Sequence, residues 1–435
     1  MKKLFSMLLV AILLTGTILS GCGKGSDSAA TEEAGPQEEI VLDLLNVKSE
    51  VNSQIESLAA KYQQETGVTV NVIAVPAGVD AQATLKGYYL SDQMPDIIAC
   101  EASGFSNWEG LLVDMSDQAW VSRTDAAYKD STYGVLGFPY TTEAIGLAYN
   151  ADILGKAGID PASITGPDAL RSAFETLDSQ KDSLGLKAVI GYCAEPTEVG
   201  WSSGNHIFGT YIDSGLGRDD TTYIDLLNDG GQVDEQRISD FANMIDLFIK
   251  YSDPDILNAS AYNDQVNGFA SGKYAFVTQG SWIGATMTGD ASADYAAAGN
   301  FQVGMLPYAF EDGMDTILTS APSWWAIPKE GNVEAAEAFL QWCSEDSGQK
   351  ILVEEAGFIS PFTDCKYVAS DPFAAVISSY ISAGKTSNWH WMQMPEGLGQ
   401  NGLAYAFSKF ATGEVDAAGF VEEIKRITEE WYAKL

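Results

Sequence analysis

Histidine and basic residues are scarce in this chain of 435 residues. Only His206 and His390 occur, and there is no HExxH, GxSxG or CxxC motif, which argues against a zinc hydrolase or a histidine-based nucleophile. The 24 lysines and arginines are outnumbered by 60 aspartates and glutamates, giving a net charge of −36. Nucleic acid is therefore excluded as a partner, because a polyanion needs basic patches that release its counterions.

Signals for metals and cofactors are also missing. Gly397 to Gly402 matches GxGxxG but follows Met-Pro-Glu instead of a strand, and Gly384-Lys385-Thr386 lacks the first glycine of a phosphate loop. We expect neither a metal nor a cofactor. The cysteines have no zinc-site spacing, and the four that follow Cys22 allow three complete disulfide pairings, which stay open: Cys100, Cys193, Cys343 and Cys365.

Long apolar runs are absent except at the start of the chain. Lys2 and Lys3 precede an uncharged stretch that ends in a leucine and two small residues before Cys22. This pattern predicts a lipoprotein signal peptide over residues 1–21, with Cys22 as the lipid-bearing residue of an extracytoplasmic, membrane-anchored protein. Residues 22–39 are Gly, Ser, Ala, Thr and Glu with one Pro, too poor in large apolar groups to pack, and predict a flexible tether.

The folded part begins with the pattern of an α/β protein. An apolar run at Ile40 to Leu45 predicts a buried strand, and an apolar stripe from Val51 to Tyr62 predicts a helix that stops at Thr66-Gly67. Val68 to Ile73 then alternates as a second strand, and Asp96 to Ala99 predicts a third. Ligands of such sheets bind beyond the carboxyl ends of the strands, which indicates residues 46–50 and 100–103.

Further elements follow the same alternation of strands and helices. Strands are predicted at 145–149 and 187–191, and Pro167 opens a helix between them. Later helices are predicted at 238–251, 333–343 and 415–431, the last with a stripe that ends at Trp431 and is typical of a packing surface.

Several tryptophans stand beside small or polar residues, outside the apolar stripes that mark a core. Flat rings beside Asp, Glu and Asn suit a sugar, because its CH faces stack on aromatic rings and its hydroxyls need directed hydrogen bonds. The tryptophans concerned are Trp201, Trp282, Trp324, Trp325, Trp389 and Trp391.

Four segments together resemble the extracellular solute-binding proteins, family 1, of carbohydrate ABC importers. They are Glu143 to Leu154, Phe269 to Trp282, Ala326 to Leu340, and Gly357 to Pro361. The resemblance implies the two-lobe type II periplasmic-binding-protein fold, an α/β architecture whose hinge-crossing strands let the lobes close over a ligand. It implies lobe 1 at residues 40–143 and 297–328, and lobe 2 at residues 144–296 and 329–435.

Positions in these motifs and in the sheet suggest the residues that face the ligand. They are Asn46, Ser49, Glu50, Glu101, Ser103, Glu143, Trp201, Trp282, Trp324 and Trp389. The chain departs from maltodextrin-type receptors at Cys100, where they carry an aromatic residue, and at Ala404, where a stacking Trp is expected. Two explanations stay open: Trp389 and Trp391 replace that platform, or the ligand is smaller or differently linked.

The expected function is capture of a mono- or oligosaccharide by a monomeric lipoprotein and its delivery to an ABC permease, without catalysis. One alternative is a receptor for a cationic solute such as a polyamine, because acids and aromatic rings together also bind ammonium groups. A surface glycoside hydrolase is a second alternative, since the many carboxylates include potential acid and base pairs. A structural or adhesive lipoprotein, which would bind no small ligand, is a third.

Overall fold

The computed structural model of the protein describes residues 40–76, 79–259 and 262–435. The expected signal peptide, the lipid-bearing Cys22 and the tether lie outside the described residues. Within those residues, no helix combines the length and the apolar character needed to cross a bilayer.

The described chain starts with the strand, helix and parallel strand that the sequence predicts. These are β1 (Val41–Asn46), α1 (Asn52–Thr66) and β2 (Thr69–Ala74), and β1 pairs with β2 in parallel along its whole length. The helix ends at Gly67, whose φ of 81° lies in the left-handed region that glycine adopts without strain. The α1 stripe is buried against the sheet, so this predicted unit is confirmed.

A mixed sheet extends from β1 and forms the core of what we call lobe 1. The third predicted strand is β3 (Ile98–Cys100), joined to β1 by the hydrogen bond from Leu45 N to Ile97 O at 2.9 Å. Beyond β3 the sheet continues with antiparallel pairs in the order β12, β5 and β4. The other elements of lobe 1 are α2 (Ala81–Leu90), β4 (Tyr128–Asp130), β5 (Gly134–Pro139), β12 (Trp324–Ala326), α12 (Val333–Cys343) and α13 (Asp346–Lys350).

A second sheet forms the core of lobe 2, in the order β10, β7, β9 and β8. Its strands are β7 (Leu147–Asn150), β8 (Ala188–Gly191), β9 (Tyr274–Val277) and β10 (Val303–Leu306). Its helices are α3 (Ala151–Ala157), α4 (Pro167–Ser179), α5 (Lys181–Leu184), α6 (Phe208–Asp213), α7 (Thr222–Asn228), α8 (Glu235–Tyr251), α9 (Tyr262–Ala270), α10 (Ile283–Thr288), α11 (Ser292–Ala297), α14 (Ala374–Ser382), α15 (Ala404–Ala411) and α16 (Ala417–Tyr432). The predicted helices at 167, 238–251, 333–343 and 415–431 are confirmed.

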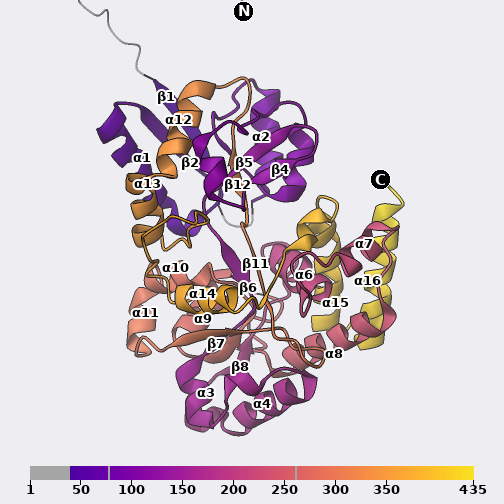
Figure 1. Ribbon diagram of the computed structural model, residues 1–435. Coiled ribbons are helices and arrows are strands. Elements are labelled where there is room, and N and C mark those ends of the chain that lie inside the picture. The colour runs from indigo at the N-terminus through magenta and orange to yellow at the C-terminus, as the bar shows by residue number, and fades with distance from the viewer. Residues whose placement is uncertain (1–39, 77–78, 260–261) are drawn as a thin grey trace, which may run out of the picture. The chain divides into compact units, whose positions relative to one another are not determined.

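Three segments connect the two sheets. The strand predicted at 145–149 is divided into β6 (Glu143–Ile145) and β7, and β6 pairs antiparallel with β11 (Ile317–Ser320). The short β13 (Thr386–Ser387) pairs with the other side of β11. The first two connecting segments thus contain β6 and β11, and the third contains Ile359, which forms a β-bridge with Thr142. Figure 1 shows β6 and β11 together.

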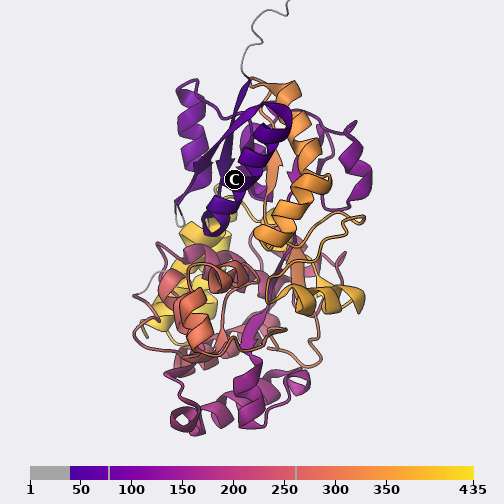
Figure 2. The same ribbon diagram turned by 90° about the vertical axis from the view of Figure 1, so that its left-hand side faces the viewer.

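These pairings differ from the lobe borders expected at 297 and 328. β10 belongs to the lobe 2 sheet, although the family resemblance implies that residues 297–328 belong to lobe 1. α12 packs on α1, with the rings of Phe339 and Tyr62 5.0 Å apart, although the resemblance implies that residues 329–435 belong to lobe 2. Figures 1 and 2 both show α12, in orange, beside the indigo α1. We propose that β11 is the return crossing and that residues from β12 to Glu355 complete lobe 1.

Candidate functional site

A cavity of about 690 Å³ is lined by residues of both lobes. One wall comes from the loops that follow β1 and β3 and from the start of α2, and the other comes from lobe 2 segments around residues 201–206, 262, 282 and 389–401. This is the carboxyl edge of the parallel strands, where the sequence places a ligand. Eight of the ten expected site residues line it: Ser49, Glu50, Glu101, Ser103, Glu143, Trp201, Trp282 and Trp389.

Asn46 does not line the cavity and shapes the loop behind it instead. Its buried side chain donates hydrogen bonds to the Lys48 carbonyl and to Asn52 Oδ1, both at 3.0 Å, and accepts one from the Lys48 N–H at 2.9 Å. Both hydrogens of its amide and one acceptor position of Oδ1 are thus used within the loop, and, contrary to the expectation, Asn46 does not line the cavity. The loop that it fixes carries Lys48 and Glu50 into the cavity wall.

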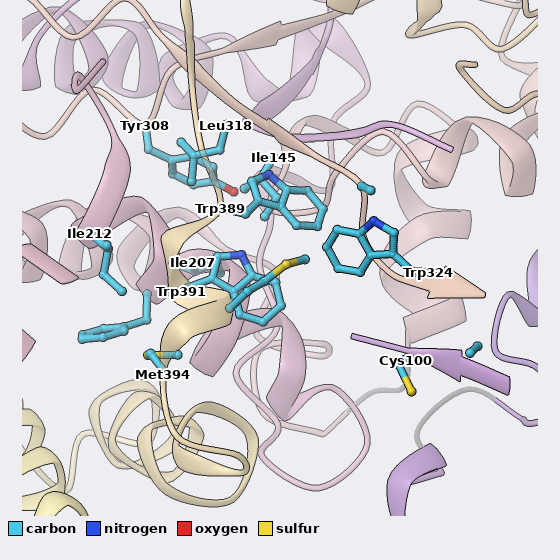
Figure 3. Packing of buried hydrophobic residues seen from close by; sticks show 14 of the residues in the cluster. Cys100, Ile145, Ile207, Ile212, Tyr308, Leu318, Trp324, Trp389, Trp391 and Met394 are labelled. Carbon is cyan, nitrogen blue, oxygen red and sulfur yellow. The ribbon is translucent and has the colours of Figure 1, made fainter. Parts of the chain in front are cut away.

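Trp324 is the other expected site residue outside the lining. It lies in β12 opposite Cys100, and Figure 3 shows both. The indole N–H donates to the Ala126 carbonyl at 2.6 Å, and the ring packs against Phe105 and Tyr128. Trp324 is thus part of the lobe 1 core, and only its neighbours Pro322 and Ser323 reach the cavity.

The lobe 1 wall contains a nearly buried ion pair. Lys48 Nζ lies 2.5 Å from Glu143 Oε1 and 3.9 Å from Glu50 Oε1, so a hinge residue and a loop residue share one cation. Burial alone would lower the pKa of Lys48, but the two carboxylates outweigh burial and raise it above its ordinary value. Burial also raises the pKa of Glu50, which Lys48 partly opposes. The wall therefore holds more carboxylate than cation.

Glu101 adds a further carboxyl group to this wall. Its side chain is exposed to the open cavity, where desolvation by the surrounding protein raises its pKa to about 7, although the Lys48 ammonium acts in the opposite direction. Because the protein stabilises the charged form of this carboxyl group so little, the group is available to accept hydrogen bonds from a ligand's hydroxyl groups.

The lobe 2 wall is aromatic. The ring centroid of His206 lies 4.8 Å from that of Trp282, 5.1 Å from Trp391, 5.2 Å from Trp201 and 5.7 Å from Trp389. All five residues line the cavity. Burial, assisted by the nearby Lys48 charge, lowers the pKa of His206 to about 3, so its ring is neutral at physiological pH. The wall thus offers flat rings and a neutral imidazole opposite the carboxylates of lobe 1.

Residues 57–376 match the family model of the bacterial extracellular solute-binding proteins. The chain belongs to this family. Its members are binding proteins that work outside the cytoplasm, not enzymes.

Relatives of known specificity bind sugars. The maltodextrin-binding protein MdxE of Bacillus subtilis (strain 168) is 24% identical over 404 residues, which are 89% of this chain and 88% of that protein. The melibiose/raffinose/stachyose-binding protein MelE of the same organism is 24% identical over 188 residues, 42% of each chain. The solved structure of the binding protein RafE with raffinose matches 90% of this chain and 99% of its own with a TM-score of 0.71, at 18% identity. The predicted two-lobe α/β fold is confirmed.

Several residues that line the cavity of this solute-binding protein are not among the site residues predicted from the sequence. Lys48 lies between two expected residues, but nothing local shows that it pairs with Glu143, 95 positions away. His206 follows Trp201 by five positions, and they reach the same wall because residues 202–207 form a π-helix, a geometry frequent at functional sites. The rarity of histidine argued only against catalysis, although it is a signal that could have drawn attention to His206.

The carboxyl-terminal part of the wall also differs from expectation. Trp431, predicted to be packing surface, packs against Gly402 and also lines the cavity. Ala404, where the resemblance leads one to expect a stacking Trp, is fully buried, and a Cβ on Gly200 would lie 3.1 Å from its side chain. A large ring at position 404 would therefore collide with the helix that begins near Gly200.

Proposed function

We propose that this solute-binding protein captures an oligosaccharide in the cavity and delivers it to an ABC permease. The observation that carries the proposal is the pairing of one aromatic wall with one carboxylate wall around about 690 Å³. Rings stack on the apolar faces of sugars, and carboxylates accept hydrogen bonds from hydroxyl groups. The sugar specificities of MdxE and MelE support this assignment.

In this proposal each wall has its own role. Trp201 and Trp282 stack on sugar rings, with Trp389 as a further platform. Glu50, Glu143 and Glu101 accept hydrogen bonds from hydroxyl groups, and Ser49 and Ser103 complete the polar lining. A sugar analogue without the matching hydroxyl would leave a buried carboxylate without a partner, so the wall selects against it.

A cationic solute such as a polyamine is the second candidate, supported by the excess of carboxylates over Lys48 in the wall. Lys48 itself favours the sugar, because its ammonium group sits among the carboxylates that a polycation would need. A neutral sugar can accept a hydrogen bond from Lys48, whereas a polycation is repelled by it.

We further propose that Cys22 carries a lipid and that residues 22–39 tether a monomeric receptor beside its permease. Two acyl chains hold a protein stably at a membrane, and a flexible segment raises the effective concentration of the receptor near the transporter. Changing Cys22 to Ala is expected to preserve ligand binding and impair uptake. Normal uptake by a Cys22→Ala strain would contradict the tether's role.

Thermal unfolding in the presence of candidate ligands tests the assignment. Maltotetraose, raffinose, stachyose, spermidine and an amino-acid panel are added to the protein in separate samples. A ligand at about 100 times its Kd adds about 2.7 kcal/mol to the free energy of unfolding. We expect at least one oligosaccharide to raise Tm. A rise with spermidine and with no sugar overturns the carbohydrate assignment in favour of the cationic solute.

A further inference from the structure

His390 separates the two tryptophans Trp389 and Trp391 and is anchored in the opposite direction. Both indoles line the cavity and are almost fully buried, with their ring centroids 5.8 Å apart. Figure 3 shows them side by side, together with Met394. The His390 side chain is only 6% exposed and faces Asp213. The backbone of this short segment therefore decides where both indoles lie.

Asp213 holds this backbone with both of its carboxylate oxygens. Oδ2 accepts the His390 backbone N–H at 2.8 Å, and Oδ1 lies 2.6 Å from His390 Nδ1. A carboxylate only accepts, so Nδ1 carries the proton in this pair. Asp213 is 1% exposed and does not line the cavity.

The Asp213 contact is the main polar anchor of the two indoles. Within the described part of the chain, the hydrogen bonds from residues 389–391 to any other element all end on Asp213. The nearest further anchors hold Ser387, whose hydroxyl donates to the Leu216 carbonyl at 2.6 Å. Ser387 lies two residues before Trp389 in the chain, so these hydrogen bonds do not involve residues 389–391.

Asp213 also ends the helical stretch that carries the other half of the aromatic wall. The π-helix Ser202–Ile207 continues into α6, so His206 and Asp213 lie on one rigid element, which Trp201 precedes. Gly209 on the same stretch lets the Trp391 ring lie against the helix, because a Cβ there would meet Trp391 Cδ1 at 2.6 Å. One helix thus presents His206 directly and fixes Trp391 through Asp213 and Gly209.

We infer that Asp213 is a positioning residue for ligand binding, which sets the Trp389 and Trp391 platform against His206 through its two contacts with His390. The inference rests on the proposed function for its effect on ligand affinity, while the geometry of the indole pair is independent of any ligand. Asp213 touches no ligand in this arrangement and acts only through His390.

The test compares Asp213→Asn with Asp253→Asn in the full chain. Asp253 is a matched control, since it is also fully buried in lobe 2, accepts the Tyr274 hydroxyl at 2.7 Å and lies outside the cavity lining. Both variants are expected to lower Tm. Two tryptophans in contact give an exciton couplet in circular dichroism, and the Trp389→Phe variant identifies the part that comes from this pair. We expect Asp213→Asn to weaken that couplet and Asp253→Asn to leave it unchanged.

Binding of maltotetraose and raffinose is then measured well below Tm. We expect Asp213→Asn to raise Kd at least about tenfold, or about 1.4 kcal/mol, for the sugar that binds the unchanged protein. Asp253→Asn is expected to stay within about twofold. An unchanged couplet and an unchanged Kd in folded Asp213→Asn overturn the inference. A lost couplet with no sugar binding by the unchanged protein overturns the carbohydrate assignment and leaves the positioning role supported.

A milder variant covers the case in which Asp213→Asn does not fold. His390→Ala keeps the backbone N–H that Asp213 Oδ2 accepts and removes only the ring contact. We expect a smaller loss of the couplet and a smaller rise in Kd than for Asp213→Asn. A folded His390→Ala protein with the native couplet and native Kd contradicts the inference.

Discussion

The two walls of the cavity are built by different means. The lobe 1 wall consists of charged side chains at the ends of regular parallel strands, where Lys48, Glu50 and Glu101 follow β1 and β3. The lobe 2 wall consists of rings on irregular elements, including the π-helix Ser202–Ile207 and the 3-10 helix His390–Gln393. Charge thus comes from the regular part of the fold and aromatic surface from the irregular part.

We therefore expect the two walls to make different contributions to ligand binding. The carboxylates of lobe 1 are held by a shared cation and by the hinge, so they are suited to fix the orientation of hydroxyl groups. The rings of lobe 2 supply apolar area, which contributes to affinity with little regard to which hydroxyl is present. Substitutions that change one wall at a time can therefore separate the two contributions.

Breaking the lobe 1 ion pair is expected to have the largest effect, and on stability. Glu143→Gln leaves the Lys48 ammonium nearly buried with only Glu50, at 3.9 Å, to compensate it. Removing one partner of a buried pair costs about 3–5 kcal/mol. Because the Glu50 carboxylate still lies near Lys48, the expected loss is at the lower end of this range. Urea unfolding measures the loss of free energy. The double variant Lys48→Met/Glu143→Gln is expected to recover most of it.

An exposed ion pair supplies the control for Glu143→Gln. Asp178 and Lys181 lie 3.4 Å apart with side chains 46% and 38% exposed, so Asp178→Asn is expected to cost less than about 1 kcal/mol. Equal losses for Glu143→Gln and Asp178→Asn would mean that the lobe 1 pair is not buried in solution. A double variant no more stable than Glu143→Gln would mean that the loss does not come from the unpaired Lys48.

Removing a ring from lobe 2 is expected to act on affinity instead. Trp282→Ala deletes a cavity ring that packs beside His206 and Trp201, and truncated anchor residues cost about 2 kcal/mol or more, roughly 30-fold in Kd. Titration calorimetry with the sugar found in the thermal screen measures it. Trp342→Ala is the control, because Trp342 stacks on Phe339 and lies outside the lining.

An unfolded Trp282→Ala protein would show that the ring belongs to the core and not to the ligand site. A folded protein with native affinity would remove Trp282 from the proposed platform. Either result would break the assignment of affinity to the lobe 2 wall.

The same division explains how much the sequence could predict. Residues after parallel strands are brought to one edge by backbone geometry, so the segments 46–50 and 100–103 could be placed from hydrophobic patterns alone. The individual residues Ser49, Glu50, Glu101 and Ser103 were named with the help of the family resemblance. The prediction for Asn46 was wrong because its side-chain amide points back toward the loop. Local hydrogen bonds set this orientation, and the hydrophobic pattern of the sequence does not reveal them. The two-lobe fold followed from the motifs, while the lobe borders depended on pairings of distant segments.

The lobe 2 wall was less predictable for a physical reason. A π-helix and short 3-10 turns have no hydrophobic period that tells which side a tryptophan takes. Trp324 and Trp389 both stand beside small or polar residues, yet one pairs within a core strand and the other lines the cavity. What separates them is a tertiary contact, the Ala126 carbonyl for one and the Asp213 anchor of His390 for the other.

The lobe 1 carboxylates are also expected to make stability depend on pH. Desolvation by the surrounding protein raises the pKa of Glu101 to about 7, while the unfolded chain titrates near about 4.3. Between these values the folded protein keeps a proton that the unfolded chain has released, so stability falls as pH rises through this window and is highest below it.

Glu101→Gln removes this titration and is expected to flatten the fall of Tm between pH 5 and pH 8. Asp371, whose pKa burial also raises to about 7, contributes in the same direction and remains in the variant, so only the difference between the two Tm curves reports on Glu101. Parallel curves would show that the Glu101 carboxyl is solvated like a surface group.

The smallest effect is expected where the two walls meet at the rim. Glu396 of lobe 2 accepts a hydrogen bond from Asn107 Nδ2 at 3.0 Å and lies 3.5 Å from Lys86 Nζ, both in lobe 1. Lys86 and Glu396 are 47% and 38% exposed, so Lys86→Ala is expected to change Kd by less than about fivefold, chiefly through faster dissociation. Stopped-flow dissociation at low and high salt measures it.

Lys61→Ala is the matched control, since Lys61 is 41% exposed in an ion pair on α1, away from the cavity. If the rim contact only joins two solvated side chains, salt removes the difference between Lys86→Ala and the unchanged protein, because exposed charges are screened. If dissociation instead accelerates far beyond fivefold, closure of the lobes depends on the rim and not on the ligand held between them. The aromatic and carboxylate walls would then account for selectivity while a surface contact controls the lifetime of the complex.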